Sequence, residues 1–499
     1  TGSITNNWIR RNDMKRKILA FVLSAAMMVG ILSGCGTGSE TETNTSGNET
    51  NQSSQGEGQD TQATPTEEKD VVTALLPPVS GTYQEKIMEY VDKFNEDNPN
   101  IEVTTASWED MTQKLDIQVN AGSPPDIAFV GADGISKYLD LGMIIDLNEY
   151  LTDELSDFDD NVLNYFRNGD GTYGLPAYCE VQCIGGNKEK LEAAGIDWQD
   201  IQKNGWTYDE FRESLKKGVE SDGSNTSCYG FVFACAGVTA KDYFSIFVKN
   251  ADMPATFDKD LKYAYTSKNM LTFLQDLRAL IDDGSMPKEL SSVDAGKRWN
   301  MMLTGQTMIT GKGLSSFERS AYNNNKLLEE GASDAVEGSI PVEYIVLPVP
   351  VFEGQQNAYG AVDGYICLTG EKNPDKTHLQ NVAKVAYFLA SGERAANTCQ
   401  ELYLSPVCDS GRESYAQLDP IENKNEFNTE CVKLLTTQIA EARPDIPAEL
   451  SAKAIKIEDE VIVPKFQGLL SGEVTPEEMY QAIVSAAQDA FGEDGCVSD

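Results

Sequence analysis

The sequence predicts an α/β protein of two lobes, each with a mostly parallel sheet flanked by helices. Three observations support this fold class. Strand and helix patterns alternate at the start of the globular body, two later segments carry signals for helix starts, and the body runs from Val71 to about Phe491. A body of that length exceeds a usual single hydrophobic core, so two lobes are expected.

The alternation begins with the apolar run Val71–Leu76, which predicts a strand. From Tyr83 to Phe94 apolar residues recur at helical spacing, and the β-branched segment Ile101–Thr105 predicts a second strand. A helix over Trp108–Val119 and a third strand over Ile127–Val130 complete the order. Because such alternation favours parallel pairing, ligands are expected at the carboxyl ends of the strands.

Two capping boxes mark helix starts further along the chain. Thr207 stands three residues before Glu210, and Thr475 stands three residues before Glu478, with Pro476 at the first helical position. We expect helices to begin there, the second running to about residue 490.

A lipoprotein signal peptide is predicted at residues 14–34. Three basic residues, Lys15–Lys17, precede an apolar run from Ile18 to Ile31, and two small residues directly precede Cys35. The apolar run is shorter than the ~20 residues that a membrane-spanning helix needs. We therefore expect Cys35 to carry a lipid that holds the chain at the cell membrane, on the extracellular face of a bacterium.

The residues on either side of this signal are not expected to fold. Residues 1–13 fit neither a signal nor a fold and are interpreted as upstream or expression-derived sequence. Residues 35–70 are rich in Gly, Ser, Thr, Asn, Gln and Glu, with almost no large apolar side chain to bury. They predict a disordered linker between the lipidated cysteine and the globular body.

The chain is strongly acidic, with a formal net charge of −39. This charge excludes nucleic acid as an expected partner. It also disfavours anionic ligands, because no run of basic residues occurs in the body. Solubility in the cell envelope is the plain explanation for the acidity.

Cysteine and histidine content argues against metal sites. Nine cysteines follow Cys35, none in a Cys-x-x-Cys pattern, and the sole histidine is His378. An odd number of cysteines cannot all pair, so neither a disulfide framework nor a zinc site is indicated, and no cofactor is expected. Cys179 and Cys183 form a possible bridge only if the backbone between them is not a straight strand.

Nine short segments of the body follow one another in an order that is typical of one protein family. They are Pro125–Ile127, Gly142–Leu147, Tyr173–Glu180, Asn187–Ile196, Trp206–Phe211, Leu303–Met308, Leu347–Pro350, Ala386–Glu393 and Ser405–Pro406. Together, behind a lipoprotein signal, they resemble the sugar-binding, maltose-binding-protein-like family of extracellular solute-binding proteins that serve ABC transporters. One departure is Gly313, where the family has an aromatic residue, and this argues against maltodextrin specificity.

The resemblance implies a two-lobed, periplasmic-binding-protein-like fold with a multi-crossing hinge. On that pattern the N-terminal lobe comprises residues 71–177 and 352–410, and the C-terminal lobe comprises residues 178–351 and 411–494. The crossings are expected near residues 178–181, 346–351 and 411–418. A few residues of this kind can absorb the change in φ and ψ that opens and closes a cleft.

A saccharide offers hydroxyls around a ring with apolar faces, so its cleft needs aromatic side chains next to planar polar groups. Residues at strand ends and crossings that fit are Trp108, Glu109, Asp133, Tyr178, Glu180, Tyr243, Asp363, Tyr365 and Arg443. The resemblance implies that Asp133 and Glu180 are ligand-contacting carboxylates.

Each of these candidates has a structural alternative. Asp133 would cap a helix near Gly134, and Glu180 would be solvated at a turn. Asp363 lies in a glycine-plus-aromatic turn that the resemblance places facing the cleft. Tyr365 would instead belong to the core, and Arg443 to a surface salt bridge.

The expected function is reversible capture of a carbohydrate by a monomer and its delivery to the permease subunits of an ABC importer, without catalysis. A surface adhesin that grips glycan and a glycoside hydrolase that uses paired carboxylates are the alternatives. A catalytic triad would have to use His378, in a turn that enters a helix away from the proposed cleft.

Overall fold

The computed structural model describes residues 69–77, 81–107, 111–237, 239–369, 375–421 and 423–498. These residues belong to one compact unit. The predicted signal peptide, Cys35 and most of the linker lie outside the described residues. So do Trp108 and Glu109.

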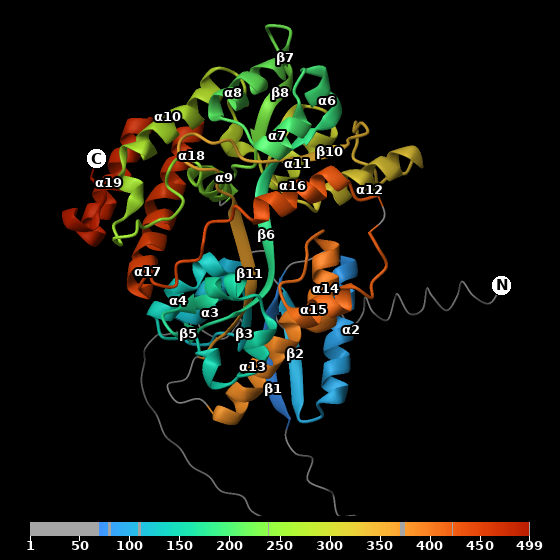
Figure 1. Ribbon diagram of the computed structural model, residues 1–499, viewed down its shortest axis with the longest axis vertical. Coiled ribbons are helices and arrows are strands. Elements are labelled where there is room, and N and C mark those ends of the chain that lie inside the picture. The colour runs from blue at the N-terminus through green and yellow to red at the C-terminus, as the bar shows by residue number, and fades with distance from the viewer. Residues whose placement is uncertain are drawn as a thin grey trace, which may run out of the picture. The chain divides into compact units, whose positions relative to one another are not determined.

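Two lobes share one continuous sheet (Figure 1). Among the described residues this sheet has nine strands in the order β2-β1-β3-β11-β6-β9-β8-β7, with β10 paired to β6, and β4 and β5 form a separate pair. The strands are β1 (Asp70–Leu76), β2 (Ile101–Ser107), β3 (Ile127–Gly131), β4 (Arg167–Asn168), β5 (Gly171–Thr172), β6 (Leu175–Asn187), β7 (Glu220–Ser221), β8 (Thr226–Phe233), β9 (Thr307–Gly313), β10 (Tyr344–Leu347) and β11 (Tyr359–Cys367).

The sheet is mixed, which corrects the expectation of mostly parallel sheets. β1 pairs in parallel with β2 and β3, and β8 pairs in parallel with β9. Around the centre, β11 runs antiparallel to β3 and β6, and β6 runs antiparallel to β9 and β10. The alternating pattern that predicted parallel pairing covers only β1 to β3, and the later strands return through both lobes.

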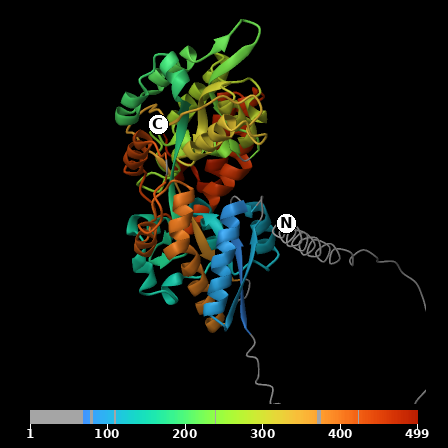
Figure 2. The same ribbon diagram turned by 90° about the vertical axis from the view of Figure 1, so that its right-hand side faces the viewer.

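The first lobe contains β1 to β3 and the helices around them (Figure 2). Its helices are α2 (Gly81–Asp97), α3 (Met111–Asn120), α4 (Ser136–Asp140), α5 (Asp160–Leu163), α13 (Lys376–Ala390), α14 (Gly392–Glu401) and α15 (Asp409–Tyr415). The predicted order of strand, helix, strand, helix, strand is confirmed here. Apolar side chains from both faces of the sheet form its core, including Val72, Leu75, Ile127 and Ala128.

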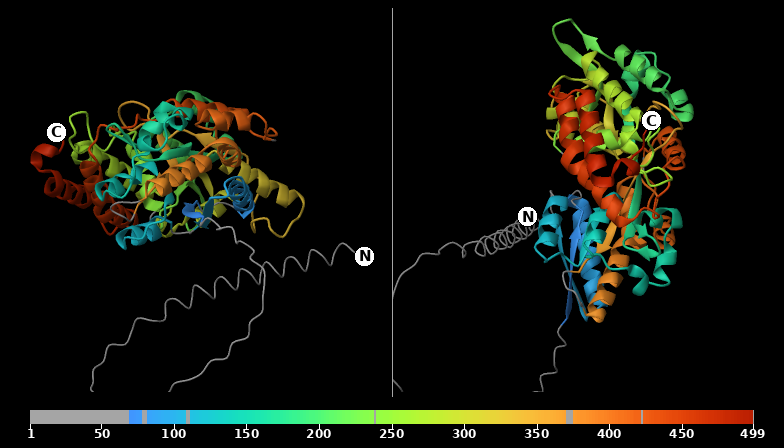
Figure 3. Two further views of the ribbon diagram at one scale, coloured as in Figure 1. Left: turned by 90° about the horizontal axis from the view of Figure 1, so that it is seen from below. Right: turned by 90° about the vertical axis from the view of Figure 1, so that its left-hand side faces the viewer.

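The second lobe holds β7 to β10 and most of the later helices (Figure 3), whereas the short pair β4 and β5 lies with the first lobe (Figure 1). These helices of the second lobe are α6 (Lys188–Ala193), α7 (Trp198–Asn204), α8 (Tyr208–Lys217), α9 (Thr239–Val248), α10 (Lys268–Asp282), α11 (Ala295–Leu303), α12 (Phe317–Glu329), α16 (Glu426–Thr436), α17 (Ala448–Ile457), α18 (Val463–Ser471) and α19 (Pro476–Phe491). Both predicted capping boxes form, at the starts of α8 and α19.

Two long strands connect the lobes. The residues of β6 begin in the core of the first lobe at Leu175 and reach the core of the second lobe at Ile184. β11 runs beside it in the opposite direction. This antiparallel pair, here called the connecting ribbon, therefore forms the floor between the lobes.

Cys179 and Cys183 both lie on β6, and the nine described cysteines are free. The straight strand separates the two thiols, so this pair is not bridged. Among the described residues, no helix is long and apolar enough to cross a membrane.

Candidate functional site

One face of the connecting ribbon carries a row of polar side chains. Because side chains alternate along a strand, Tyr178, Glu180 and Gln182 of β6 share a face. In the register of the pair, Asp363 lies opposite Tyr178, and Tyr359 lies opposite Gln182. We call these five residues the polar ladder. Only Ala361 stands opposite Glu180, so no large side chain covers this carboxylate from β11.

The ladder contains two carboxyl groups that are held away from water. Glu180 is 8% exposed, and the hydroxyl of Tyr178 donates a hydrogen bond to Oδ2 of Asp363 at 3.0 Å. Burial raises the pKa of Glu180 to about 7, with Lys312 opposing the shift and Asp363 adding to it. Burial also raises the pKa of Asp363 to about 6, although the hydrogen bond from Tyr178 opposes that shift.

Asp133 reaches the ladder from the end of β3. It lies in a short 3₁₀ turn, Ala132–Gly134, and its Oδ2 accepts a hydrogen bond from the Tyr359 hydroxyl at 3.2 Å. A Cβ at Gly131 would lie 2.7 Å from Oδ1 of Asp133 and 3.3 Å from Oδ1 of Asp363. The two carboxylates therefore converge on the space beside Gly131, which only a glycine leaves open.

These positions settle the structural alternatives for the two strongest candidates. Asp133 caps no helix, because neither the 3₁₀ turn nor α4 has a side-chain cap hydrogen bond. Glu180 is not solvated at a turn, since it is buried in the middle of a strand.

The second lobe faces the ladder with charged side chains. Lys312 of β9 pairs with Asp242 of α9 at 3.4 Å, and Lys241 of α9 pairs with Glu458 at 2.9 Å. The ammonium of Lys249 lies over the ring of Tyr359, 5.6 Å from its centroid. Burial lowers the pKa of Lys249, against the attraction of Glu458 and Asp133.

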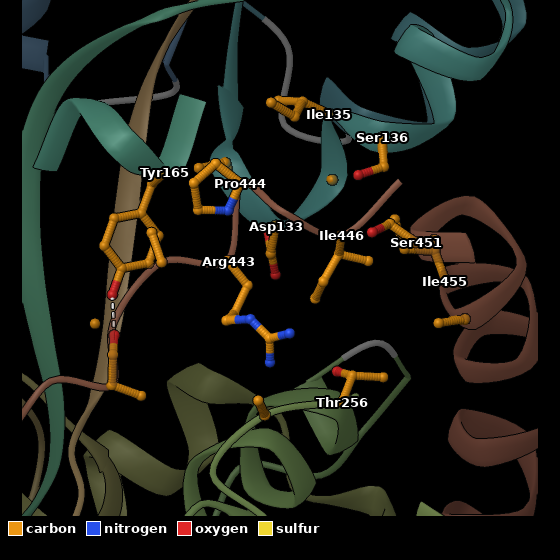
Figure 4. Close-up of a pocket in the computed structure, with 18 of the residues that line it drawn as sticks. Asp133, Ile135, Ser136, Tyr165, Thr256, Arg443, Pro444, Ile446, Ser451 and Ile455 are labelled. Atoms are coloured by element: carbon orange, nitrogen blue, oxygen red, sulfur yellow. Dashed lines mark hydrogen bonds between the residues drawn. The ribbon is translucent and has the colours of Figure 1, made fainter. Parts of the chain in front are cut away.

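A cavity of about 410 Å³ is lined by Asp133, Tyr359, Lys241, Lys249 and Glu458. Of the polar ladder only Tyr359 belongs to this lining, and Tyr178, Glu180, Gln182 and Asp363 lie further along the connecting ribbon. Figure 4 shows Asp133 and Arg443 on its lining, with Tyr165 at one side. The Tyr165 hydroxyl donates a hydrogen bond to the carbonyl oxygen of Ala440 at 2.5 Å. A second cavity, of about 840 Å³, lies beyond this contact and is lined by Cys179 and Val181, which face away from the ladder.

Arg443 lines the first cavity and is also a salt-bridge partner, so both interpretations of this residue hold. It pairs with Asp445 at 2.7 Å and donates hydrogen bonds to the carbonyl oxygens of Phe257 and Asp258. These bonds fix the segment before α17 against the second lobe.

Two predicted aromatic contacts are wrong. Tyr243 is 0% exposed and stacks on Phe233 in the core of the second lobe, because α9 turns this residue inward. Tyr365 is 5% exposed and packs against Phe129 in the core of the first lobe.

The expected turn at Asp363–Tyr365 is also wrong, because these residues lie within β11. A Cβ at Gly364 would collide with the carbonyl oxygen of Leu175, at a shift in the register between β11 and β6. The glycine thus serves strand packing and does not admit a ligand to the backbone.

Several charged and polar residues of the site escape the sequence-based argument. Gln182 could have been found from the period of two along β6 that relates it to Tyr178 and Glu180. Lys241, Asp242 and Lys249 could not, since a helix pattern alone does not show which lobe faces which. His378 binds Asp70 and Asp126 at the opposite, amino ends of β1 and β3.

Two lobes, a shared polar floor and a cavity between opposing charged walls define a protein that encloses a small polar solute. Residues 80–393 match the family model of the bacterial extracellular solute-binding proteins. The chain belongs to this family.

Comparison with individual relatives agrees with this assignment. A binding protein of Brucella abortus strain 2308 is 24% identical over 341 residues, which cover 66% of this chain and 73% of the relative. The arabinooligosaccharide-binding protein of Halalkalibacterium halodurans is 21% identical over 202 residues, or 39% of this chain and 42% of that protein.

Solved structures show the same fold at low sequence identity. The GacH receptor of Streptomyces glaucescens, solved unliganded and with acarbose, has a TM-score of 0.64 and 17% identity, covering 85% of this chain and 99% of its own. Maltose-bound MalE3 of T. maritima has a TM-score of 0.63 and 17% identity, covering 84% and 99%. A substrate-binding protein of Listeria monocytogenes with cycloalternan has a TM-score of 0.62 and 19% identity, covering 86% and 100%.

Proposed function

We propose that this chain captures a saccharide on the polar ladder and delivers it intact to the permease subunits of an ABC importer. The ladder is the observation that carries the proposal. Tyr178, Glu180, Gln182 and Asp363 are planar or hydroxyl-bearing groups, and such groups accept and donate the paired hydrogen bonds that sugar hydroxyls make. Relatives named for arabinooligosaccharide or solved with maltose support a saccharide as the ligand class.

Capture would proceed by closure of one lobe on the other. We propose lobes of residues 71–177 with 352–410 and of residues 178–351 with 411–494. Because α15 packs on the first lobe as far as Tyr415, the last of the proposed crossings, near residues 411–418, would fall at the end of that helix. A ligand that touches Asp133 of the first lobe and Lys312 of the second stabilises the closed arrangement by its differential contacts. Trp108 and Glu109 would add contacts from the first lobe.

Lipidation of Cys35 would keep the protein beside its permease. The signal sequence argues for this anchor, and the polar linker would let a monomer reach the transporter while it stays at the membrane. Growth in labelled palmitate followed by immunoprecipitation tests the anchor, and Cys35→Ala should abolish the label.

Binding without catalysis fits the chemistry of the site better than hydrolysis does. Glu180 is buried beneath the cleft with only Ala361 opposite it, a position suited to accepting a hydrogen bond. His378 cannot assist, since it lies at the other end of the strands, held by Asp70 and Asp126.

A thermal-shift screen across mono-, di- and oligosaccharides tests the proposal. A ligand at one hundred times its Kd stabilises the folded chain by about 2.7 kcal/mol, which is readily measured as a rise in Tm. Asp133→Ala should remove most of that rise without unfolding the unliganded chain. Its matched control is Asp97→Asn, an exposed carboxylate at the end of α2 that is not part of the cavity lining. No response to any saccharide would contradict the proposed ligand class.

A further inference from the structure

The charges that face the polar ladder do not balance. Lys312 is paired with Asp242, and Lys241 is paired with Glu458. Three carboxyl groups, those of Asp133, Glu180 and Asp363, have no ion-pair partner among the described residues.

Two lysines act on these three carboxyls. Lys312 faces Glu180 and Asp363 but is shared with Asp242, and Lys249 faces Asp133. Of the basic side chains that line the cavity, Lys249 alone makes no ion pair within the described part of the chain. The others pair with aspartates or a glutamate: Lys137, Arg167, Lys241 and Arg443. The floor of the cleft therefore has an excess of negative charge and of hydrogen-bond acceptors.

A buried amide on the ladder shows independently that a donor is missing. Gln182 is 5% exposed, and its Oε1 has no hydrogen-bond partner. It shares the ladder face with Glu180, two residues away on β6. A buried acceptor without a donor is costly, so a ligand that supplies an N–H or O–H to it recovers that energy.

Two of the three carboxyls are close enough to act on one group, since Asp133 and Asp363 both approach the open space beside Gly131. Glu180 adds negative charge beside them, because Asp363 lies two residues along β11 from Ala361, which faces Glu180. No cluster of His, Cys, Asp and Glu in the described ranges is arranged to hold a metal ion. A cation carried by an organic ligand fits this space.

We propose, on the basis of the proposed function, that the preferred ligand is a saccharide bearing a protonated amine. Its ammonium is held by Asp133 and Asp363, with the charge of Glu180 beside them. The N–H donors of an ammonium match the carboxylate oxygens of these two residues. Charge-assisted hydrogen bonds of this kind are about twice as strong as neutral ones. A neutral sugar would leave the excess charge uncompensated.

The titration of the ladder gives the inference a pH signature. Glu180 is faced by Lys312 and Asp242 from the second lobe and by Asp363 and Tyr178 from the ribbon. Asp363 is faced by Tyr178, Asp133, Lys312 and Asp242, and Lys241, Lys249 and Glu458 surround Asp133. Because the pKa values of Glu180 and Asp363 are raised by burial, both lose charge as the pH falls below 7. Affinity for an ammonium should fall with them, and affinity for a neutral sugar should not.

Calorimetry with matched pairs of sugars tests the inference. The pairs are glucose with glucosamine, galactose with galactosamine, mannose with mannosamine, and cellobiose with the chitosan disaccharide. In at least one pair we expect the amine to bind at least tenfold tighter at pH 7.5, and that advantage to shrink at least tenfold at pH 5.5. N-acetylation, which removes the charge, should abolish the advantage.

Two variants separate the charge from the shape of the site. Glu180→Gln and Asp363→Asn should each reduce the preference for the amine, while the exposed control Glu460→Gln should leave it unchanged. Binding of neutral members as tightly as amines in every pair would overturn the inference and leave the proposed function standing. Failure of every probe to bind, or an equal thermal shift with CaCl₂, would also overturn it, and the neutral saccharide screen would then decide the wider function.

Discussion

At the scale of single residues, Glu180 shows how burial changes the titration of the carboxyl that we propose as a ligand contact. The carboxyl is 8% exposed, and burial raises its pKa from 4.5 to about 7. The folded chain therefore holds a proton that the unfolded chain releases between these two values. The unliganded protein should lose stability as the pH rises through this window.

Glu180→Gln should remove that loss. Since one pKa unit corresponds to about 1.4 kcal/mol, we expect the variant to gain on the order of 2–3 kcal/mol over the parent between pH 4.5 and pH 8. Urea unfolding at both pH values measures the gain. An identical pH dependence of the unfolding free energy in parent and variant would contradict a raised pKa for the Glu180 carboxyl.

A substitution at a nearby glycine tests whether ligand binding depends on the direction in which the Asp133 side chain points. In Gly131→Ala the new methyl group would occupy the place of Oδ1 of Asp133, and that flexible side chain would rotate away. We expect ligand affinity to fall at least tenfold, by about 1.4 kcal/mol or more, with little change in Tm.

Gly134→Ala, where a Cβ would meet nothing within 4 Å, controls for stability only, because Gly134 lines the cavity. The control for binding is Gly296→Ala on α11, where a Cβ would meet only Oδ1 of Asp294, at 3.4 Å. It should bind ligand like the parent. If Gly131→Ala and Gly296→Ala both bind normally, Asp133 is not a ligand contact.

The sequence predicts some of these residues and not others for a definite reason. Tyr178, Glu180 and Asp363 lie on strands, and Asp133 lies in the turn directly after one, so a short motif and an alternating period locate their side chains. The predicted ligand contact at Tyr243 is wrong because the exposure of this side chain depends on how α9 is rotated over the sheet. No local sequence pattern specifies that rotation.

At the scale of elements, the connecting ribbon depends on close packing of two strands. β11 and β6 shift register at Gly364, where a side chain would collide with the backbone of β6. Because backbone cannot move aside as a side chain does, we expect Gly364→Ala to destabilise the fold by at least about 2 kcal/mol. Differential scanning calorimetry against Gly134→Ala measures it, and an unchanged Tm would contradict the register described here.

Sequence patterns locate individual elements better than their pairing. The strands and helices from β1 to β3 and the capping boxes of α8 and α19 are confirmed, since each depends on local periodicity or local hydrogen bonds. The antiparallel centre of the sheet is not local. β11 pairs with strands that lie far earlier in the chain, and the alternation pattern holds no information about that return.

At the scale of the whole molecule, the two lobes should approach each other when ligand binds. Contacts from both lobes to one ligand favour the closed population, and the shift cannot exceed the ligand's differential affinity for the two states. Small-angle X-ray scattering should show a smaller radius of gyration at saturating saccharide. A radius that is unchanged at saturation would argue that the lobes do not move.

The central claim is that the polar ladder holds a saccharide reversibly and leaves it intact. Calorimetric titration of the purified protein with the best saccharide from the screen, followed by chromatography of the recovered sugar, tests it most directly. The account predicts one ligand per chain, recovered unaltered, with Glu180→Gln and Asp133→Ala each binding at least tenfold more weakly. Cleaved sugar released over many turnovers, or full affinity in both variants, would contradict it.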